Sequence, residues 1–382
     1  MKVYLDNNAT TSVSEEVRQT IIKELDNFGN PSSLHSFGVK ARSAIEKSRK
    51  NIAECINCLP DEIVFTSGGT ESNNMAIQGY LRRYNSGGVI TSSIEHHAVL
   101  NVAKNLSDSG FNIAVAGVDR TGRVKVEEIV EAVSDETLLL SIMLANNEVG
   151  AIQPVSEIVR LVRERNDNVR IHCDAVQGLG KIIVDVKKLN IDMLSISSHK
   201  IHGPKGVGAL YIKKGIRIDP LCQGGHHEKG LRPGTENTPA IAGFGKAVEL
   251  AGRDLEKIRE KTGKLRDRLR EKIMGSINNI TLNSNCEESL SNTLNISFNN
   301  IEGEAIIMML DMEGIAVSSG SACTSGSVEP SHVLTSMGVD PAFAQGSIRF
   351  SLSHYNTEEE IDYTVEKLIP VIKKLREMSP VK

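Results

Sequence analysis

The sequence predicts an α/β protein with a mostly parallel sheet of seven strands, followed by a smaller α+β domain. Between residues 60 and 245, short β-rich runs alternate with amphipathic stretches of helical length. Strands that alternate with helical crossovers are typical of parallel sheets. The seven expected strands share this β-rich character and cover residues 62–66, 88–91, 112–116, 138–144, 170–174, 193–197 and 208–212.

The segment before this alternating region predicts two elements. Residues 1–13 are expected to form an extended N-terminal arm that packs with the small domain. Residues 12–15 (Ser-Val-Ser-Glu) have the pattern of a capping box at the start of a helix. The residues that follow at helical spacing are apolar: Val17, Ile21, Leu25 and Phe28. We expect the large domain to comprise residues 14–260.

The charged stretch 245–277 predicts one long connecting helix, inside which the domain boundary falls. Its apolar residues lie on a single stripe: Leu255, Ile258, Leu265, Leu269 and Ile273. Residues 261–382 are then expected to form the small domain, with strands at residues 293–298, 316–318 and 347–352. Residues 357–360 (Thr-Glu-Glu-Glu) predict the start of a final helix.

Composition excludes several classes of protein. The 382 residues are 40% hydrophobic and 24% charged, which is an ordinary globular balance, and the net charge of −4 predicts no attraction to nucleic acid or membranes. The first residues lack the apolar core of a signal sequence, and no apolar run is long enough to span a bilayer. Six cysteines suit a reducing compartment, so we expect a cytoplasmic protein.

The most informative residue is Lys200, which stands where an apolar run (residues 191–198) gives way to a glycine-rich turn. A lysine that emerges from a buried strand is partly desolvated, and desolvation favours the neutral, nucleophilic amine. The aldehyde of pyridoxal phosphate is the common biological partner of such an amine. Taken alone, the pattern is also typical of a surface lysine whose stem packs against the protein.

Asp174 ends a second apolar strand, 26 residues before Lys200. One crossover connects the two, so both side chains are expected at the same edge of the sheet. A buried aspartate can keep the ring nitrogen of a pyridoxal cofactor protonated, which the cofactor needs in order to accept electrons. The alternative is an aspartate at the end of a strand that only caps the next helix.

A third feature is the turn that contains Gly68 and Gly69, between a short apolar strand and a helical stretch. Glycines let the backbone approach an anion, and the free amides of a first helical turn bind phosphate. The turn matches neither the P-loop nor the dinucleotide-binding pattern. An ordinary strand-to-helix turn is the alternative interpretation.

Cys323 is embedded in residues 318–327, a run of serine and glycine with almost no apolar side chain to bury the thiol. Such a composition predicts a solvated loop, and a thiol on it is best explained as a nucleophile. No second cysteine or histidine lies at ligand spacing, so we expect no metal site.

Together these motifs resemble the cysteine desulfurases, which are pyridoxal phosphate enzymes of aminotransferase fold type I. The resemblance runs through nearly the whole chain, from residues 4–11 to residues 346–350, and its most specific segments are residues 145–150, 174–177 and 321–325. The long Cys323 loop, which continues through residues 328–334, is similar to the group that serves iron–sulfur and nitrogenase cluster assembly. The short-loop group, which includes selenocysteine lyases, fits less well.

The resemblance implies roles for residues around the cofactor. Lys200 would hold pyridoxal phosphate through an imine, Asp174 would hold the proton of the ring nitrogen, and Gln177 would donate to the ring phenolate oxygen. His96, rather than His97, would stack on the ring. The phosphate-binding residues would be Gly69, Thr70, Ser197, His199 and, from the other subunit of a homodimer, Thr235.

The resemblance also implies the reaction. Asn147 and Arg349 would position L-cysteine, with the guanidinium pairing with its carboxylate. Lys200 would move the α-proton, and Cys323 would take the substrate sulfur as a persulfide and pass it to an acceptor or iron–sulfur scaffold protein, leaving L-alanine. The alternatives are a selenocysteine lyase, another fold type I enzyme such as an aminotransferase, or a catalytically silent scaffold for sulfur transfer.

The chain departs from the family pattern in two places. His226 and His227 stand where the family commonly has Gly-Gln, and Pro233 stands where a small serine or alanine is usual. The two histidines would line the cleft or the dimer contact. Pro233 would stiffen the turn that carries Thr235 without removing its hydroxyl.

Overall fold

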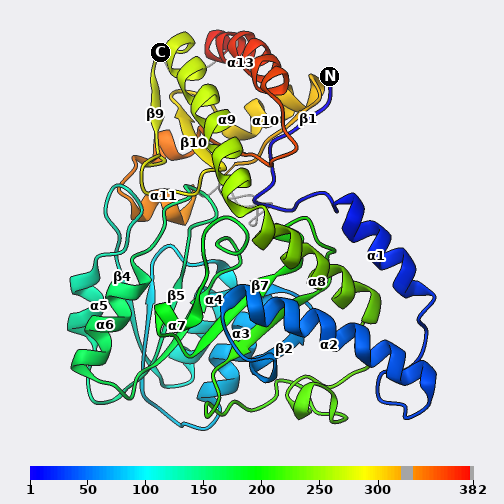
Figure 1. Cartoon of the computed structure of the whole chain (residues 1–382). Coiled ribbons are helices and arrows are strands. Elements are labelled where there is room, and N and C mark those ends of the chain that lie inside the picture. Colours follow the sequence, from blue (N-terminus) through cyan, green and yellow to red (C-terminus); the bar gives the residue numbers. More distant parts are fainter. Residues whose placement is uncertain (320–329, 379–382) are drawn as a thin grey trace.

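The computed structural model describes residues 1–319 and 330–378 (Figure 1), and a seven-stranded sheet forms the centre of its larger part. All seven predicted strands are present, with ends shifted by at most one residue. The order across the sheet is β2-β8-β7-β6-β5-β3-β4, and only β8 runs antiparallel to its neighbours in it. The strands are β2 (Ile63–Thr66), β3 (Gly88–Ser92), β4 (Asn112–Ala116), β5 (Thr137–Met143), β6 (Arg170–Asp174), β7 (Met193–Ser197) and β8 (Gly208–Ile212).

Helices cover both faces of this sheet. One apolar cluster includes side chains of α3 (Gly69–Leu81) and α4 (His97–Asp108). The cluster on the other face draws on α2 (Ser36–Ile56), α5 (Val126–Ala132), α6 (Val155–Arg165) and α8 (Thr238–Arg253). Alternate strand residues supply the two clusters, as with Met193 and Leu194 of β7, because successive side chains of a strand point to opposite faces. Two further α-helices of this part are α1 (Glu15–Leu25) and α7 (Val186–Leu189), and three short 3-10 helices lie in its loops: η1 (Pro60–Glu62), η2 (Ser198–Lys200) and η3 (His227–Gly230).

The second part is a three-stranded antiparallel sheet with helices packed on it. The strand order is β12-β10-β9, and the strands are β9 (Ile280–Leu282), β10 (Thr293–Phe298) and β12 (Ser347–Ser351). β9 is too short to be found from sequence pattern. The helices are α9 (Leu255–Ser276), α10 (Gly303–Met312), α11 (His332–Ser336), α12 (Pro341–Ala344) and α13 (Glu358–Met378). Thr357 caps α13 as predicted, since its Oγ1 accepts a hydrogen bond from the Glu360 amide.

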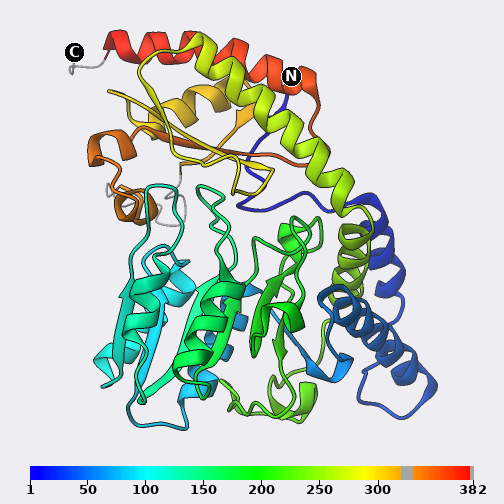
Figure 2. The same ribbon diagram turned by 60° about the vertical axis from the view of Figure 1, so that its left-hand side comes forward.

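The N-terminal segment belongs structurally to the second part, although it begins the chain. β1 (Val3–Tyr4) pairs in parallel with β11 (Ile315–Ala316), and Val3 and Leu5 join the apolar cluster built from α9, β10, α10, β12 and α13. Figures 1 and 2 show this segment passing between the two parts before it reaches α1. The division into residues 1–13, 14–260 and 261–382 remains our proposal, and the separation of the apolar clusters supports it.

The predicted single helix over residues 245–277 is wrong, because α8 ends at Arg253 and α9 begins at Leu255. Asp254 lies between them with ψ of 10°. The break has a physical reason: the buried face of α8 packs on the cluster of the large sheet, whereas Leu265, Leu269 and Ile273 of α9 pack on the second cluster. A single straight helix would have to pack on both apolar clusters.

The first predicted helix begins later than the capping box indicates. Ser14, not Ser12, is the N-cap of α1, and its Oγ accepts a hydrogen bond from the Val17 amide. Val17 is fully buried, but Leu25 and Phe28, which the apolar pattern grouped with it, are exposed. Within the described ranges, we find no helix whose length and apolar character would let it cross a membrane.

A buried ion pair ties α2 to the loop before α8. Arg49 donates to both carboxylate oxygens of Glu228, at 2.9 and 2.7 Å, and also to the Ile63 carbonyl. The Glu228 carboxylate further accepts from the Phe65 amide at 2.7 Å, which connects the pair to β2. The two side chains are only 8% and 3% exposed.

Replacing Glu228 with glutamine should lower the free energy of unfolding by about 3 kcal/mol, because it leaves the Arg49 charge buried without a counter-charge. Urea unfolding at fixed protein concentration measures this loss. The matched control is Glu164→Gln, which removes an exposed pair with Arg160 and should cost less than about 0.5 kcal/mol. Equal losses in the two variants would contradict the assignment.

Candidate active site

The predicted cofactor residues lie at one edge of the seven-stranded sheet. Asp174 ends β6 and Lys200 follows β7, and these two strands are parallel neighbours. β2 runs in the same direction as β7, since both are antiparallel to β8, so the Gly68 turn reaches the same edge. Ligands of open α/β sheets bind beyond such carboxyl ends.

Lys200 directs its amine at the N-terminal segment. Its Nζ donates to the backbone carbonyls of Asn8, at 2.6 Å, and Ala9, at 2.8 Å. The residue also lines a cavity of about 110 Å³. These contacts favour the interpretation of Lys200 as an amine in a cleft over that of a surface lysine.

Asp174 is buried, and its two oxygens have different partners. Oδ1 accepts from the Val176 amide at 3.0 Å, so it caps a turn, and not the helix that the capping alternative expected. Oδ2 accepts from Asn73 Nδ2 on α3 at 2.6 Å. The capping of this turn and the cofactor interpretation are therefore compatible, because the second oxygen is oriented by a separate residue.

His96 is the N-cap of α4, and its Nδ1 accepts a hydrogen bond from the Ala98 amide at 3.0 Å. Burial lowers the pKa of His96, and the positive charge of Lys200 acts in the same direction, whereas the negative charge of Asp174 raises it. His96 therefore lies within electrostatic reach of both predicted catalytic side chains. His97 instead contacts His332, with ring centroids 4.8 Å apart.

The turn after β2 forms a cradle that a side chain would fill. Gly68 has φ of +153°, and a Cβ on Gly69 would lie 2.7 Å from Val176 Cγ2. Gly68 is the N-cap of α3 and supplies no side chain to cap its first turn, which contains Thr70. Facing this turn, the Ser197 hydroxyl is buried and has no hydrogen-bond partner in the described part of the chain.

His199 and Gln177 face the N-terminal segment beside this cradle. His199 Nδ1 lies 3.2 Å from Thr10 Oγ1, and burial lowers the pKa of His199 to about 4. Gln177 Nε2 donates to the Asn8 carbonyl at 2.9 Å, the same carbonyl that accepts from Lys200. The Gln177 NH2 group is therefore on the side of the amide that faces the Asn8 carbonyl and Lys200.

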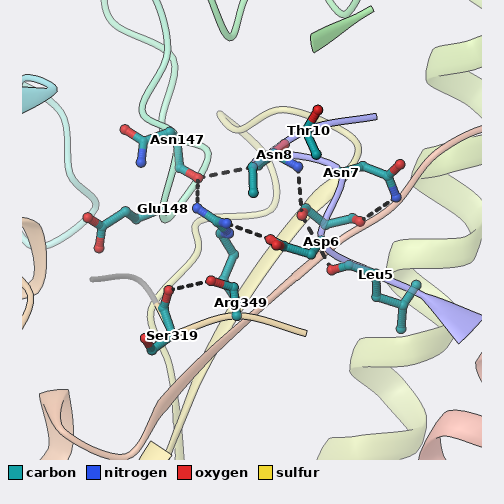
Figure 3. A network of polar contacts seen from close by, with 12 residues as sticks. Leu5, Asp6, Asn7, Asn8, Thr10, Asn147, Glu148, Ser319 and Arg349 are labelled. Atoms are coloured by element: carbon teal, nitrogen blue, oxygen red, sulfur yellow. Dashed lines mark hydrogen bonds and ion pairs between the residues drawn. The ribbon is translucent and has the colours of Figure 1, made fainter. Parts of the chain in front are cut away.

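Arg349 reaches the site from β12 of the second part, as Figure 3 shows. One of its terminal nitrogens donates to the Asn147 carbonyl at 3.1 Å, and the other donates to Asp6 Oδ1 at 2.7 Å. The Arg349 Nε is buried and has no partner among the described residues. The N–H group at Nε is therefore available to donate a hydrogen bond to a further carboxylate.

Two buried carboxyl groups adjoin the site without appearing among the predicted residues. Burial raises the pKa of Glu95 to about 8, although Ser92 Oγ and the Met143 amide donate to it. Burial also raises the pKa of Glu148 to about 7, against a hydrogen bond from Ser331 Oγ at 2.5 Å and the positive charge of Arg349. Both groups hold a proton more firmly than exposed glutamates do.

The remaining predicted residues are not joined to this cluster. Cys323 lies outside the described residues. Thr235 is exposed on the loop before α8. His226 and His227 line a separate surface hollow of about 440 Å³, and the described ranges contain no cluster of three or more residues placed to bind a metal ion.

Comparison with known proteins identifies the family of this chain. Residues 3–364 match the family model described as aminotransferase class-V. The chain is 47% identical to cysteine desulfurase IscS of Methanosarcina thermophila over 381 residues, which cover 99% of this chain and 94% of that protein. It is also 47% identical to cysteine desulfurase IscS of Dictyoglomus turgidum over 384 residues, which cover 100% and 97%.

Two solved structures are similar over most of their length. A structure described as a NifS-like protein superimposes with a TM-score of 0.93 at 43% identity, covering 98% of this chain and 100% of that one. A structure of SspA in complex with cysteine has a TM-score of 0.83 at 37% identity, covering 93% and 100%.

Fold and site together define a pyridoxal phosphate-dependent enzyme of fold type I. The chain belongs to the class-V aminotransferase family and, within it, to the cysteine desulfurases. The residues present fit the cofactor of this family. The unpartnered Ser197 hydroxyl and the uncapped turn of α3 suit a phosphate, and the buried Asp174 suits a protonated ring nitrogen.

Besides Glu95 and Glu148, three residues without a role predicted from sequence contact the site: Asp6 binds Arg349, the Asn8 carbonyl accepts from Lys200, and Lys181 donates to Gln177. Asp6 and Asn8 belong to residues 4–11, which carry the family resemblance, and three consecutive polar residues directly after an apolar strand were a usable signal. Lys181 follows Gln177 by four residues in the apolar context Gly-Leu-Gly-Lys-Ile-Ile. A lysine in such a run predicts burial, which is costly unless the amine has a partner.

The raised pKa of Glu148 predicts a pH-dependent contribution to stability. The folded state holds the proton up to about pH 7, whereas the unfolded state releases it near 4.5, so stability is lost as the pH rises through this window. Glu148→Gln removes the titration. The unfolding free energy of E148Q minus that of the wild type should therefore grow by on the order of 3 kcal/mol between pH 4 and pH 8.

Urea unfolding of both proteins across this pH range measures the difference. The control Glu164→Gln, at an exposed position, should show a difference that is constant with pH. A constant difference for E148Q would contradict the buried, protonated state of Glu148.

Proposed function

We propose that this protein is a cysteine desulfurase that converts L-cysteine to L-alanine and carries the sulfur on Cys323. The observation that supports the proposal is that Lys200 and Asp174 lie at one edge of the large sheet, while Arg349 binds the same N-terminal segment as Lys200. Lys200 and Asp174 come from adjacent strands, and Arg349 comes from the second part. The cysteine desulfurases at 47% identity support the same activity.

When bound, pyridoxal phosphate withdraws electrons from the substrate carbon next to the amine. Lys200 would attach the cofactor and then move the α-proton of the substrate. Asp174, held by Asn73, would keep a proton on the ring nitrogen. His96 would pack against the ring, and Gln177 would donate to the ring oxygen. Four residues would hold the phosphate within this chain: Gly69, Thr70, Ser197 and His199.

Arg349 and Asn147 would orient the amino acid. The Arg349 Nε has no partner among the described residues, and the Asp6 carboxylate pairs with one terminal nitrogen. A substrate carboxylate can use the unpartnered Nε and displace Asp6 from the guanidinium. Asn147 is positioned next to the arginine through its own carbonyl.

The sulfur step conserves atoms and electrons. The Cys323 thiolate attacks the substrate sulfur, the bond between sulfur and Cβ breaks, and Cβ keeps the electron pair and takes up a proton. L-Cysteine and the Cys323 thiol thereby become L-alanine and a Cys323 persulfide. The persulfide then passes its outer sulfur to an acceptor. We propose that this acceptor is an iron–sulfur scaffold protein, as the IscS name of the relatives suggests. We also propose that the protein is located in the cytoplasm.

Two substitutions test the activity. Lys200→Ala should abolish both L-alanine formation and the visible absorbance of bound cofactor, since no amine remains to attach the aldehyde. Cys323→Ser should keep the absorbance but form no persulfide when the protein is incubated with ³⁵S-cysteine. Label on Cys323 in the wild type is measured by gel autoradiography without reductant, with Cys222→Ser, an exposed thiol outside the site, as control.

The outcomes separate the alternatives. Unchanged turnover in Lys200→Ala would refute the proposal. Selenide release from selenocysteine by Cys323→Ser, without sulfide release from cysteine, would favour a selenocysteine lyase. A wild-type protein that binds no cofactor would favour a silent scaffold.

We also propose a homodimer, in which Thr235 of each chain completes the phosphate site of its partner. An apolar patch supports this. Phe28 is 78% and Leu34 90% exposed, and the Phe28 and Phe37 rings lie 5.3 Å apart. The other exposed apolar residues of this segment are Ile22, Leu25 and Val39. Exposed apolar side chains concentrated in residues 22–39 are typical of an interaction surface, which a second copy would bury.

Introducing charge into this patch, with Phe28→Asp and Leu34→Asp together, should convert the dimer into a monomer, because buried carboxylates without partners oppose association. Analytical ultracentrifugation measures the mass. Met312→Asp, an equally exposed apolar position on α10, should leave the dimer intact. A wild-type monomer, or an unchanged mass in the double variant, would contradict the proposed dimer face.

A further inference from the structure

Lys181 is a buried lysine for which the proposed reaction has no use. It lies in the turn after β6, is 8% exposed, and forms no ion pair with a carboxylate of the described ranges. Burial lowers its pKa well below the ordinary lysine value, and the charges of Lys200 and Arg349 act in the same direction. His202 lines the same cavity as Lys181. A residue this costly to bury calls for a function.

The Lys181 amine is held by two side-chain oxygens. Its Nζ donates to Gln177 Oε1 at 2.6 Å and to Asn8 Oδ1 at 3.1 Å. On the opposite side, Gln177 Nε2 donates to the Asn8 backbone carbonyl, which can only accept. Both contacts require the same orientation of the Gln177 amide: oxygen toward Lys181, nitrogen toward the carbonyl that also binds Lys200.

The contact with Asn8 fixes a second amide in the same way. Asn8 Oδ1 accepts from Lys181 and from Asn292 Nδ2, so Asn8 Nδ2 is free to donate to Thr293 Oγ1 and to the Asn147 carbonyl. That carbonyl also accepts from Arg349. Lys181 thus supports the hydrogen bonds at both the cofactor end and the substrate end of the site.

We infer that Lys181 is a positioning residue, which acts through Gln177 to keep a hydrogen-bond donor directed at the ring oxygen of pyridoxal phosphate on Lys200. The inference rests on the proposed function and on the donor role of Gln177 within it. Without Lys181, the Gln177 amide loses the partner of its oxygen and is free to turn over. A neutral amine suffices for this role, because it still has two N–H donors.

The absorbance of the bound cofactor reports this hydrogen bond without any turnover. A donor at the ring oxygen weakens the hold of that oxygen on the proton it shares with the nitrogen of Lys200. Lys181→Met, which keeps the length of the side chain but removes the donor, should therefore raise the pH midpoint of the visible band. The expected rise is about 0.5 to 1 pH unit, equivalent to one neutral hydrogen bond.

Matched variants separate positioning from charge and from folding. Lys188→Met removes an exposed lysine seven positions away and should leave the midpoint at the wild-type value. Lys181→Gln keeps a donor for Gln177 without any charge, and should return the midpoint close to that of the wild type. In a Gln177→Ala background, Lys181→Met should cause no further shift, because its effect passes through the missing amide.

Each result decides the matter. A wild-type midpoint in Lys181→Met, or an equal shift with and without Gln177, would overturn the inference while the proposed function stands. A midpoint in Lys181→Gln as high as in Lys181→Met would overturn it too, since charge would then be the cause. A wild-type protein that takes up no pyridoxal phosphate would overturn both the inference and the proposed function.

Discussion

The backbone of residues 5–11 is the element on which the site depends, because it is hydrogen-bonded to both parts of the molecule. On one side, the Leu5 amide donates to Ala316 and the Asn7 amide donates to Ser351. On the other side, the Thr11 amide donates to the His199 carbonyl. The Asn8 carbonyl lies between these anchors and accepts from Lys200 and Gln177. The first residues of the chain therefore fix the position of the Lys200 amine.

Several ionisable side chains are buried close to this segment. Three basic side chains (Lys181, Lys200 and Arg349) and three acidic ones (Asp174, Glu95 and Glu148) adjoin one site. Each of the six is hydrogen-bonded to a backbone, amide or hydroxyl group. Hydrogen bonds of this kind fix the orientation of a buried group and offset part of the cost of its burial.

The strands of the large sheet could be predicted well because the pattern that indicates each strand lies within a few consecutive residues. Each of the seven strands is an apolar run with its own boundaries, and β6 and β7 place Asp174 and Lys200 at a common edge by topology alone. The break at Asp254 could not be predicted, since it follows from which apolar cluster each half of the charged stretch meets. The exposure of Phe28 could not be predicted either, because the spacing of apolar residues indicates an apolar stripe on a helix but not the surface against which that stripe packs.

The same limit applies inside the site. Residue types and spacing single out Lys200 and Asp174, because their chemistry is distinctive. The contact of Asp6 with Arg349 and that of Lys181 with Asn8 join segments that lie more than 170 positions apart, and local spacing does not reveal such partners.

The shape of the turn after β2 depends on glycines in two different segments. A Cβ on Gly208 of β8 would lie 2.7 Å from the Gly68 Cα, so the turn after β2 rests directly on the backbone of its neighbouring strand. A side chain at position 208 would push this turn away from Ser197, which faces it from β7. The cradle therefore depends on two glycines. Gly68, in the turn after β2, allows the backbone angle of the turn, and Gly208, on the adjacent strand β8, leaves room for it. One of the two requirements for glycine therefore lies outside the turn that we propose binds phosphate, on strand β8.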